Sequence, residues 1–194
     1  MIKKRNRQWM GLVLVFALIA GLVLPAASVN TAGKSGKKKV LVVYFSATGT
    51  TKNAAKNIKK ATGGKLYQIK AEEPYTEEDL DYSNDNCRAN TEQNNESTRP
   101  GIDGKVKNIR KYDVIFIGYP IWWGKEPMII RTFLESYNLE GKKIVPFCTS
   151  GGSGISGSIN GIKEAASGAT VAEGKDLTDL SAKNIKNWAK KNIK

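Results

Sequence analysis

The sequence predicts an α/β fold in which a parallel sheet is covered by helices on both faces. Three short, continuously apolar runs, residues 40–45, 114–118 and 143–149, are rich in β-branched and aromatic side chains. This composition is typical of parallel strands that are buried on both faces. Segments with helical spacing of small apolar and polar residues intervene between the runs. Strands that alternate with helices in this way favour a single sheet between two helical layers.

Taken in chain order, the expected elements begin at residue 40. The expected strands are residues 40–45, 66–70, 114–118, 143–149 and, more weakly patterned, 170–174. The expected helices are residues 51–61, 127–136, 156–166 and 181–192. The polar segment 72–104 departs from the alternation, and a loop of that length in a compact domain is usually functional or carries short helices of its own.

The first 39 residues differ in composition from the rest of the chain. Lys3, Lys4, Arg5 and Arg7 precede an uncharged aliphatic run, residues 10–24, that ends in Pro-Ala-Ala-Ser. This order is typical of a cleaved signal peptide, but the absence of charge between residues 8 and 33 also suits an uncleaved membrane anchor. We therefore expect the protein to be exported, and either secreted or anchored on the outer side of the cytoplasmic membrane. The expected parts are residues 1–28 as signal peptide or anchor, 29–39 as a basic Gly/Lys linker and 40–194 as one domain.

Much of the formal net charge of +13 belongs to this N-terminal part. Eight of the 31 basic residues precede residue 40, where there is no acidic residue, so 23 basic residues face 18 acidic ones in the domain. No basic stripe interleaved with aromatic residues occurs, so we expect no nucleic-acid partner. The excess charge is expected on solvated helix faces, with weak attraction to anionic polymers or lipid headgroups as the alternative.

The chain contains no histidine and only two cysteines, Cys87 and Cys148. The usual general base and commonest metal ligand are therefore absent, and no zinc site or Cys–His nucleophile pair can be built. No GxSxG element is present. Cys148 lies in an apolar strand and Cys87 in polar sequence, and export leaves a disulfide between them open. If the protein does chemistry, we expect a bound organic cofactor to supply it and no metal.

A turn of hydroxyl-bearing residues and glycine, SATGTT at residues 46–51, joins the first apolar run to a predicted helix. A helix leaves its first amide groups without intrahelical acceptors, and its dipole favours an anion there. The same residues are also typical of an ordinary helix cap. Because the turn lacks the GKS or GKT ending of a nucleoside-triphosphate loop, a phosphomonoester fits better than ATP.

Two further loops follow the other long apolar runs, YPIWWG at residues 119–124 and TSGGSG at 149–154. Ligands in open parallel sheets bind beyond the carboxyl ends of the strands, where all three loops should meet. Trp122 and Trp123 are candidates to stack on a flat ligand, with Gly124 allowing close backbone approach. In the alternative reading, the tryptophans pack under a helix and the glycines only form turns. Residues 152–157 also satisfy GxGxxG, but they come too late in the chain for a dinucleotide fingerprint.

Together these motifs resemble the flavodoxins, specifically a branch with PIWWG and TSGGSG loops. The resemblance rests on YFSATGTTKNAA, EPYTEEDLDY, YDVIFIGYPIWWGKEP and RTFLESYNLEGKKIVPFCTSGGSGI, and it covers most of residues 40–177. It implies a flavodoxin-like three-layer sandwich, a five-stranded parallel sheet in order 2-1-3-4-5, and noncovalently bound flavin mononucleotide (FMN). It also implies that Tyr75 approaches the flavin or a partner.

The resemblance assigns the cofactor-binding residues by motif. Phosphate is expected on Ser46, Thr48, Gly49, Thr50 and Thr51. One side of the flavin ring is expected against Pro120, Ile121, Trp122, Trp123 and Gly124, and the other against Thr149, Ser150, Gly151, Gly152, Ser153 and Gly154. The hydroxyls of Thr149 and Ser150 are the candidates for hydrogen bonds to the ring edge. No protein residue is expected to act as acid, base or nucleophile.

The leading functional hypothesis is electron transfer outside the cytoplasmic membrane. The flavin would supply the redox chemistry and the protein would tune it. A reductase of quinones or related small aromatic acceptors is the first alternative, and a flavin-free interaction module the second. Flavodoxins are typically acidic, whereas this domain is mildly basic. We therefore expect an unusual redox partner protein or a membrane electron donor, with the N-terminus as a possible membrane contact.

Overall fold

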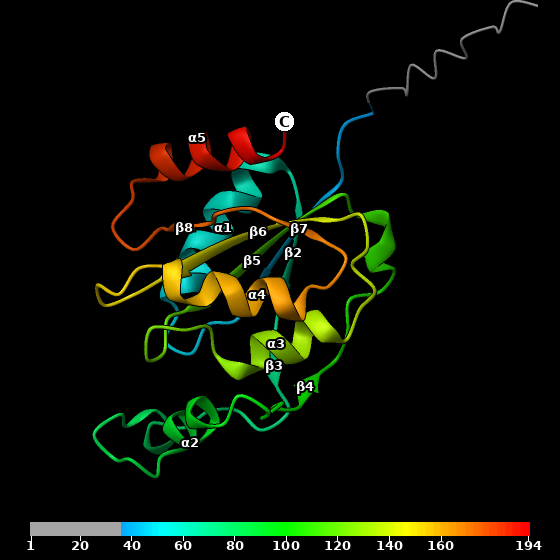
Figure 1. Ribbon diagram of the computed structural model, residues 1–194. Coiled ribbons are helices and arrows are strands. Elements are labelled where there is room, and N and C mark those ends of the chain that lie inside the picture. Colours follow the sequence, from blue (N-terminus) through cyan, green and yellow to red (C-terminus); the bar gives the residue numbers. More distant parts are fainter. Residues whose placement is uncertain (1–35) are drawn as a thin grey trace, which may run out of the picture. The chain divides into compact units, whose positions relative to one another are not determined.

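A parallel sheet runs through the computed structural model, which describes residues 36–194 (Figure 1). Its long strands are β1 (Val40–Tyr44), β2 (Lys65–Gln68), β5 (Val114–Pro120) and β6 (Lys143–Thr149). With β7 (Thr170–Val171), the strands lie in the order β2-β1-β5-β6-β7, and β8 (Lys175–Asp176) also pairs with β6. Counted along the chain among the strands of this sheet, the path β2 to β7 is the expected 2-1-3-4-5.

The fifth strand differs from the expectation of a single run over residues 170–174. Two short pieces, β7 (Thr170–Val171) and β8 (Lys175–Asp176), pair separately with β6. Gly174 lies between them with φ +78°, a left-handed conformation that interrupts an extended strand. The second strand is also shifted from its expected range, because residues after Gln68 leave the sheet and Lys70–Ala71 forms β3, paired with β4 (Ile102–Asp103).

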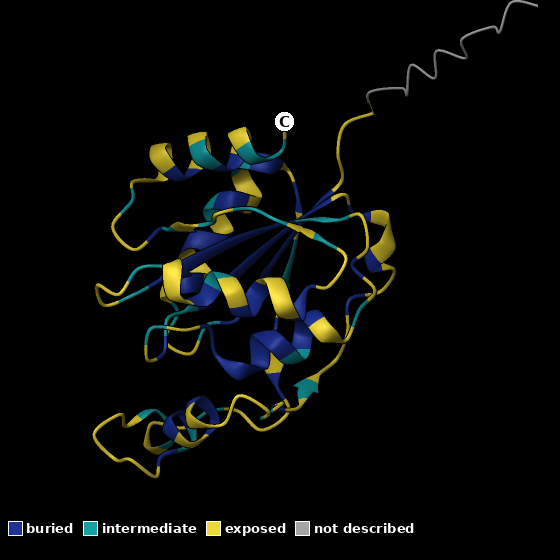
Figure 2. Cartoon of the chain, viewed as in Figure 1, coloured by how far each residue is buried: buried dark blue, intermediate teal, exposed yellow. Residues whose placement is uncertain are grey.

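Side chains of β1 alternate between two hydrophobic cores, one on each face of the sheet. Leu41 and Val43 belong to one core, while Val40, Val42 and Tyr44 belong to the other. All five are buried, which explains why the strand is continuously apolar (Figure 2).

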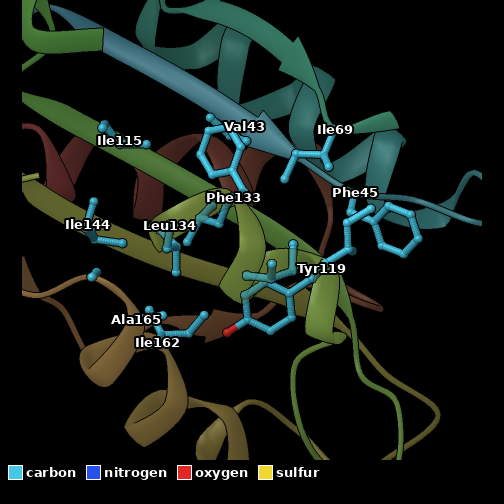
Figure 3. Close-up of a cluster of buried hydrophobic side chains, with 14 of the residues drawn as sticks. Val43, Phe45, Ile69, Ile115, Tyr119, Phe133, Leu134, Ile144, Ile162 and Ala165 are labelled. Carbon is cyan, nitrogen blue, oxygen red and sulfur yellow. The ribbon is translucent and has the colours of Figure 1, made fainter. Parts of the chain in front are cut away.

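Helices cover both faces of the sheet, as predicted. The side chains of α1 (Thr50–Thr62) and α5 (Ala182–Asn192) contribute to the core that contains Val42. The other core takes side chains from α3 (Met128–Glu135) and α4 (Ile159–Ala165), and Figure 3 shows Phe133, Leu134 and Ile162 of these helices packed against strand residues. The three layers follow from these two cores.

The long polar segment carries short helices of its own, as the sequence suggested. It contains η1 (Glu78–Leu80) and α2 (Arg88–Asn94), and it ends at β4. Two further 3₁₀ turns, η2 (Ile109–Lys111) and η3 (Ser156–Ser158), precede β5 and α4. In Figure 1 the segment with α2 lies at the end of the domain opposite α5.

The predicted signal peptide or anchor, residues 1–28, lies outside the described residues, as does the linker before residue 36. Within residues 36–194, no helix is both long and apolar enough to cross a membrane. Cys87 and Cys148 are both buried and free, so the structure contains no bond between them.

Candidate functional site

The three loops predicted to converge do meet at the carboxyl edge of the sheet. A cavity of about 330 Å³ lies between them and takes lining residues from each loop. Four of its lining residues, Ala47, Leu80, Tyr82 and Thr178, were not among the predicted site residues. Those that were are Thr48, Thr50, Pro120, Ile121, Trp122, Thr149, Ser150 and Gly151.

The first loop leaves backbone amides open at the start of α1. The hydroxyl oxygen of Ser46 accepts hydrogen bonds from the amides of Gly49 (3.1 Å) and Lys52 (3.3 Å). Those are two of the four amides that a helix start cannot satisfy within the helix, so the amides of Thr50 and Thr51 remain for a ligand. Gly49 has φ +97°, a conformation that favours glycine and turns the loop into the helix. The arrangement is suited to an anion.

The hydroxyl of Thr51, which was predicted to ligate phosphate, makes a hydrogen bond within the protein. Its side chain is 1% exposed, and its Oγ1 lies 2.8 Å from Oγ1 of Thr149. This hydrogen bond ties the start of α1 to the end of β6. The hydroxyls of Thr51 and Thr149 therefore hold two loops together, while the Thr51 amide stays available.

The second loop reverses direction through its two tryptophans. The amide of Ile121 donates to the carbonyl of Thr149 (2.9 Å), and Trp122 and Lys125 exchange backbone hydrogen bonds of 3.0 Å. Trp123 has φ +49° and Gly124 has φ +78°, so the turn uses two left-handed residues in succession. The chain is thereby fixed against the third loop.

Trp122 is almost fully buried within an aromatic cluster, of which it and Tyr82 line the cavity. Its ring meets Phe45, Tyr75 and Tyr82 edge to face, with centroid separations of 5.7, 5.3 and 6.4 Å. Such edge-to-face pairs add to the stabilisation gained from area burial alone. Most of the Trp122 ring therefore packs inside the protein, as in the alternative interpretation of the sequence. Trp122 nevertheless still lines the cavity.

The side chain of Trp123 lies in different surroundings from that of Trp122. It is 63% exposed and does not line the cavity. Its indole nitrogen donates to Oδ1 of Asn90 on α2 at 2.6 Å, and its ring meets that of Tyr82 at 6.4 Å. The structure thus does not bring both predicted tryptophans into the same lining.

The third loop is organised by the side chain of Ser150. Its hydroxyl donates to Oδ2 of Asp176 (2.6 Å) and accepts from the amides of Gly152 (3.2 Å) and Gly154 (3.1 Å). Partial burial raises the pKa of the Asp176 carboxyl, but hydrogen bonds from Ser150 and Thr178 outweigh it, so the pKa lies below its usual value. The Ser150 hydroxyl, which was predicted to bind the ring edge, therefore makes its hydrogen bonds within the third loop and to Asp176. Gly152, Ser153 and Gly154 lie outside the cavity lining.

Gln93 on α2 was not identified from the sequence, yet it fixes the second loop. Its buried side-chain amide donates to the carbonyls of Trp122 (3.1 Å) and Glu126 (3.2 Å), and its Oε1 accepts from the amide of Met128 (3.2 Å). The segment 72–104 is thereby joined to the site. Nothing in the local pattern of a polar helix marks one glutamine as buried.

Tyr75 lies beside the site within the same aromatic cluster. Its hydroxyl donates to Glu92 on α2 (2.6 Å), and the guanidinium of Arg88 lies 4.1 Å from its ring centroid. Burial, together with the Glu92 carboxylate, raises the pKa of Tyr75 far above its usual value. The residue therefore stays protonated and braces α2 against the site.

Glu126 follows the second loop and is completely buried. Its Oε1 accepts from Nε of Arg131 at 2.8 Å, whereas its Oε2 has no hydrogen-bond partner. Burial raises the pKa of this carboxyl despite the nearby guanidinium. The pair supports the start of α3 and lies outside the cavity lining.

Other ligand chemistry has little support in the described part of the chain. Another hollow, of about 440 Å³, is lined by Ser46 and Ala47 of the first loop together with Phe45, Lys70 and Tyr75 among others. Residues 36–194 contain no group of three or more His, Cys, Asp or Glu residues placed to hold a metal ion.

The family model described as flavodoxin matches residues 39–192. No curated protein sequence matches the chain.

Solved structures resemble the domain over nearly their whole length. A protein from Bacteroides eggerthii assigned as a flavoprotein shares 46% identity with a TM-score of 0.77, covering 81% of this chain and 99% of its own. A second such protein, from Bacteroides uniformis, shares 39% identity with a TM-score of 0.76, covering 80% and 99%. A flavoprotein in complex with FMN from Lactobacillus acidophilus shares 28% identity with a TM-score of 0.59, covering 72% and 92%.

Proposed function

Because this chain belongs to the flavodoxin family, we propose that it is an FMN-dependent redox protein that carries electrons on the outer side of the cytoplasmic membrane. The observation that carries the proposal is the cavity formed by the three strand-end loops. It joins an open helix start, suited to a phosphate, to an aromatic lining, suited to a flat ring.

FMN is the cofactor, and the residues present fit it. The amides of Thr50 and Thr51 would hold the phosphate, with the exposed hydroxyl-bearing side chains of Thr48 and Thr50 at the same place. Ile121 and Trp122 would flank the ring on one side and Ser150 and Gly151 on the other. The relative from Lactobacillus acidophilus, which is in complex with FMN, supports this cofactor. When bound, FMN supplies the electron-accepting and electron-donating chemistry.

The lining of the cavity favours an electron carrier over an enzyme that moves protons with its own side chains. No Asp, Glu, Lys or Arg is among its lining residues, and the chain has no histidine. Tyr82 is the one lining tyrosine, and burial raises its pKa, so it stays protonated near neutral pH. The chain's own residues bind and orient the cofactor, exclude water from one side of it and hold no mobile proton there.

A reductase of quinones or related small aromatic acceptors is the second candidate. It is favoured by the exposed aromatic pair of Tyr82 and Trp123 at the edge of the site, 43% and 63% exposed. Large exposed aromatic side chains next to a site are suited to a flat second ligand or a partner. The flavin-free interaction module is less favoured, because the open amides of the first loop would then have no ligand to bind.

The proposed location rests on the sequence of the first 28 residues. Basic residues followed by an uncharged aliphatic run are typical of export, and the basic end should remain cytoplasmic. Cytoplasmic NADH and NADPH would then not reach the flavin. A membrane-bound donor, such as a quinol or a membrane flavoprotein, is the partner that we propose.

The two candidates separate in one pair of assays. In the first assay, the FMN-loaded protein is mixed with NADH or NADPH and a quinone. In the second, a separate sample is mixed with membranes and an electron source that reduces their quinone pool. A carrier shows bleaching of the flavin absorbance by reduced membranes and no steady turnover of nicotinamide. Steady nicotinamide oxidation that depends on the quinone identifies the reductase instead. Without bleaching in either assay, the carrier proposal fails.

A further inference from the structure

The helices α1 and α5 carry basic side chains and no acidic ones. All of their lysines are exposed, and none forms an ion pair within residues 36–194. We call this surface the lysine face; its members are Lys52, Lys56, Lys59, Lys60, Lys183, Lys186, Lys190 and Lys191. These exposed charges are solvated and screened by salt, but eight lysines on adjacent helices still create a positive field that attracts anionic groups.

Helix electrostatics accounts for only part of this face. A cation in the last turn interacts favourably with the helix dipole, which explains Lys59 and Lys60 on α1 and the pair at the end of α5. In the first turn a cation is unfavourable, yet Lys52 and Lys183 lie there and neither helix has an acidic residue in its first turn. Helix stability therefore does not explain the lysines at these positions.

The lysines also border two hollows between the helices. One, of about 480 Å³, is lined by Lys52 and Lys56 together with Thr48, Gly49 and Thr50, so it also borders the proposed phosphate site. The other, of about 390 Å³, is lined by Lys60 of α1 together with Lys183 and Lys186 of α5. In this second hollow both helices contribute charge, so a negatively charged group there would meet several ammonium groups at once.

Acidic residues gather elsewhere in the domain. Residues 72–103 contain ten of the 18 acidic residues of the chain, with Arg88 and Arg99 as their only basic residues. Figure 1 shows this segment, around α2, at the opposite end of the domain from α5. The two ends therefore carry opposite charge, and an anionic surface would attract the domain with the lysine face inward.

The N-terminal side of the described chain joins the domain close to this face. The ammonium group of Lys38 contacts the carbonyl oxygen of Lys194, just beyond the end of α5, at 2.5 Å. The ammonium group of Lys143 donates to the carbonyl of Asn192 (2.8 Å), and burial together with Lys38 lowers its pKa. The sequence that precedes residue 36 includes the uncharged aliphatic run of residues 10–24, whose composition suits a membrane.

We propose that the lysine face docks the domain onto an anionic lipid surface, with the acidic end directed away from it. The charge separation supplies the orientation, and the contact between Lys38 and Lys194 holds the first described residues beside the end of α5. An acidic protein partner would match the charge as well, but the aliphatic run in the sequence of residues 10–24 favours a lipid surface. The proposal goes beyond the redox function and does not depend on the flavin.

The experiment measures binding of residues 36–194, loaded with FMN, to lipid vesicles. This part folds on its own, since it holds every element of the sheet and both cores, and the Bacteroides chains are matched by it over 99% of their length. Vesicles of phosphatidylcholine are compared with vesicles that also contain phosphatidylglycerol. The triple variant K60Q/K183Q/K186Q is compared with K105Q/K107Q/K163Q, which removes the same charge from exposed lysines outside the lysine face.

The wild-type domain and the control variant should bind the anionic vesicles and not the neutral ones. Each lysine near an anionic surface contributes about 1 kcal/mol, so the variant in the lysine face should bind on the order of 100-fold more weakly than wild type. Binding should weaken as salt shortens the screening length. Equal losses in the two variants, equal binding to neutral vesicles, or no vesicle binding at all would overturn the proposal. FMN titration of the same samples reports the redox site separately.

Discussion

The hydroxyl groups of Thr51 and Thr149 lie 2.8 Å apart, although 98 residues separate them in the chain. Thr51 belongs to the first turn of α1, and Thr149 is the last residue of β6. Both are buried, so their hydrogen bond is shielded from water. It sets the spacing between the loop proposed to hold the phosphate and the loop proposed to flank the ring.

Removing the Thr51 hydroxyl should loosen that spacing. Thr51→Val keeps the shape but leaves the Thr149 hydroxyl without its partner, so the free energy of unfolding should fall by about 1–2 kcal/mol. FMN affinity should fall with it, by roughly tenfold. Thr149→Val and the double variant complete a cycle, measured by urea unfolding and FMN titration. Additive losses in the double variant would show that the two hydroxyls do not act together.

Gln93 should contribute strongly to stability even though it lies outside the cavity lining. Gln93→Met keeps the length of the side chain but leaves the carbonyls of Trp122 and Glu126 and the amide of Met128 without their partner. A loss of about 2–4 kcal/mol in the free energy of unfolding is expected, because buried unpaired groups are costly. The matched control is Asn94→Met on the exposed side of α2. If both variants unfold at the same urea concentration, Gln93 does not anchor the loop.

The two adjacent tryptophans should respond differently to the same substitution. Trp122→Phe creates a gap in the aromatic cluster and alters the cavity lining, so about 1–2 kcal/mol of stability and roughly tenfold in FMN affinity should be lost. Trp123→Phe keeps an exposed ring and removes its hydrogen bond to Asn90, so stability should fall by about 1 kcal/mol or less and FMN affinity should hardly change. Unfolding curves and FMN titration of both variants test this. A larger loss of affinity in Trp123→Phe would place that ring on the flavin.

Glu126 should make the stability of the domain depend on pH above the ordinary range of a carboxyl group. Its pKa in the folded protein is raised from 4.5, so the unfolded chain releases this proton first as pH rises. Its contribution is therefore most favourable below pH 4.5 and declines as pH rises through the folded pKa.

Glu126→Gln removes that titration while keeping the side-chain shape. The free energy of unfolding, measured from pH 4 upward, should then decline less steeply in the variant than in the wild type. The opposite ordering of the two slopes would show that Arg131 lowers the pKa of Glu126 by more than burial raises it.

Much of the fold was predictable because buried parallel strands and helices differ in their local patterns. The runs at residues 40–45, 114–118 and 143–149 correspond to β1, β5 and β6. The fifth strand was weakly patterned in sequence, and its division around Gly174 depends on that residue's backbone conformation, which composition does not specify.

The site was predictable in its location and less so in the roles of its side chains. The carboxyl ends of parallel strands must share an edge, so the three loops were expected to meet. By contrast, the hydroxyls of Thr51, Thr149 and Ser150 bind other parts of the protein. The roles of Gln93 and Asn90 arise from contacts with a loop about 30 residues away. Such long-range pairs leave no local signal in the sequence.

Titration of FMN into residues 36–194 tests the central claim most directly. Flavin fluorescence and absorbance are recorded for the wild type and for Gly49→Val, which forces a branched side chain into the left-handed turn before α1. We expect saturable binding of one FMN per chain with altered flavin fluorescence, and much weaker binding in the variant. A domain that is folded by circular dichroism and binds no FMN, or binds it equally well after the substitution, would contradict the proposed site.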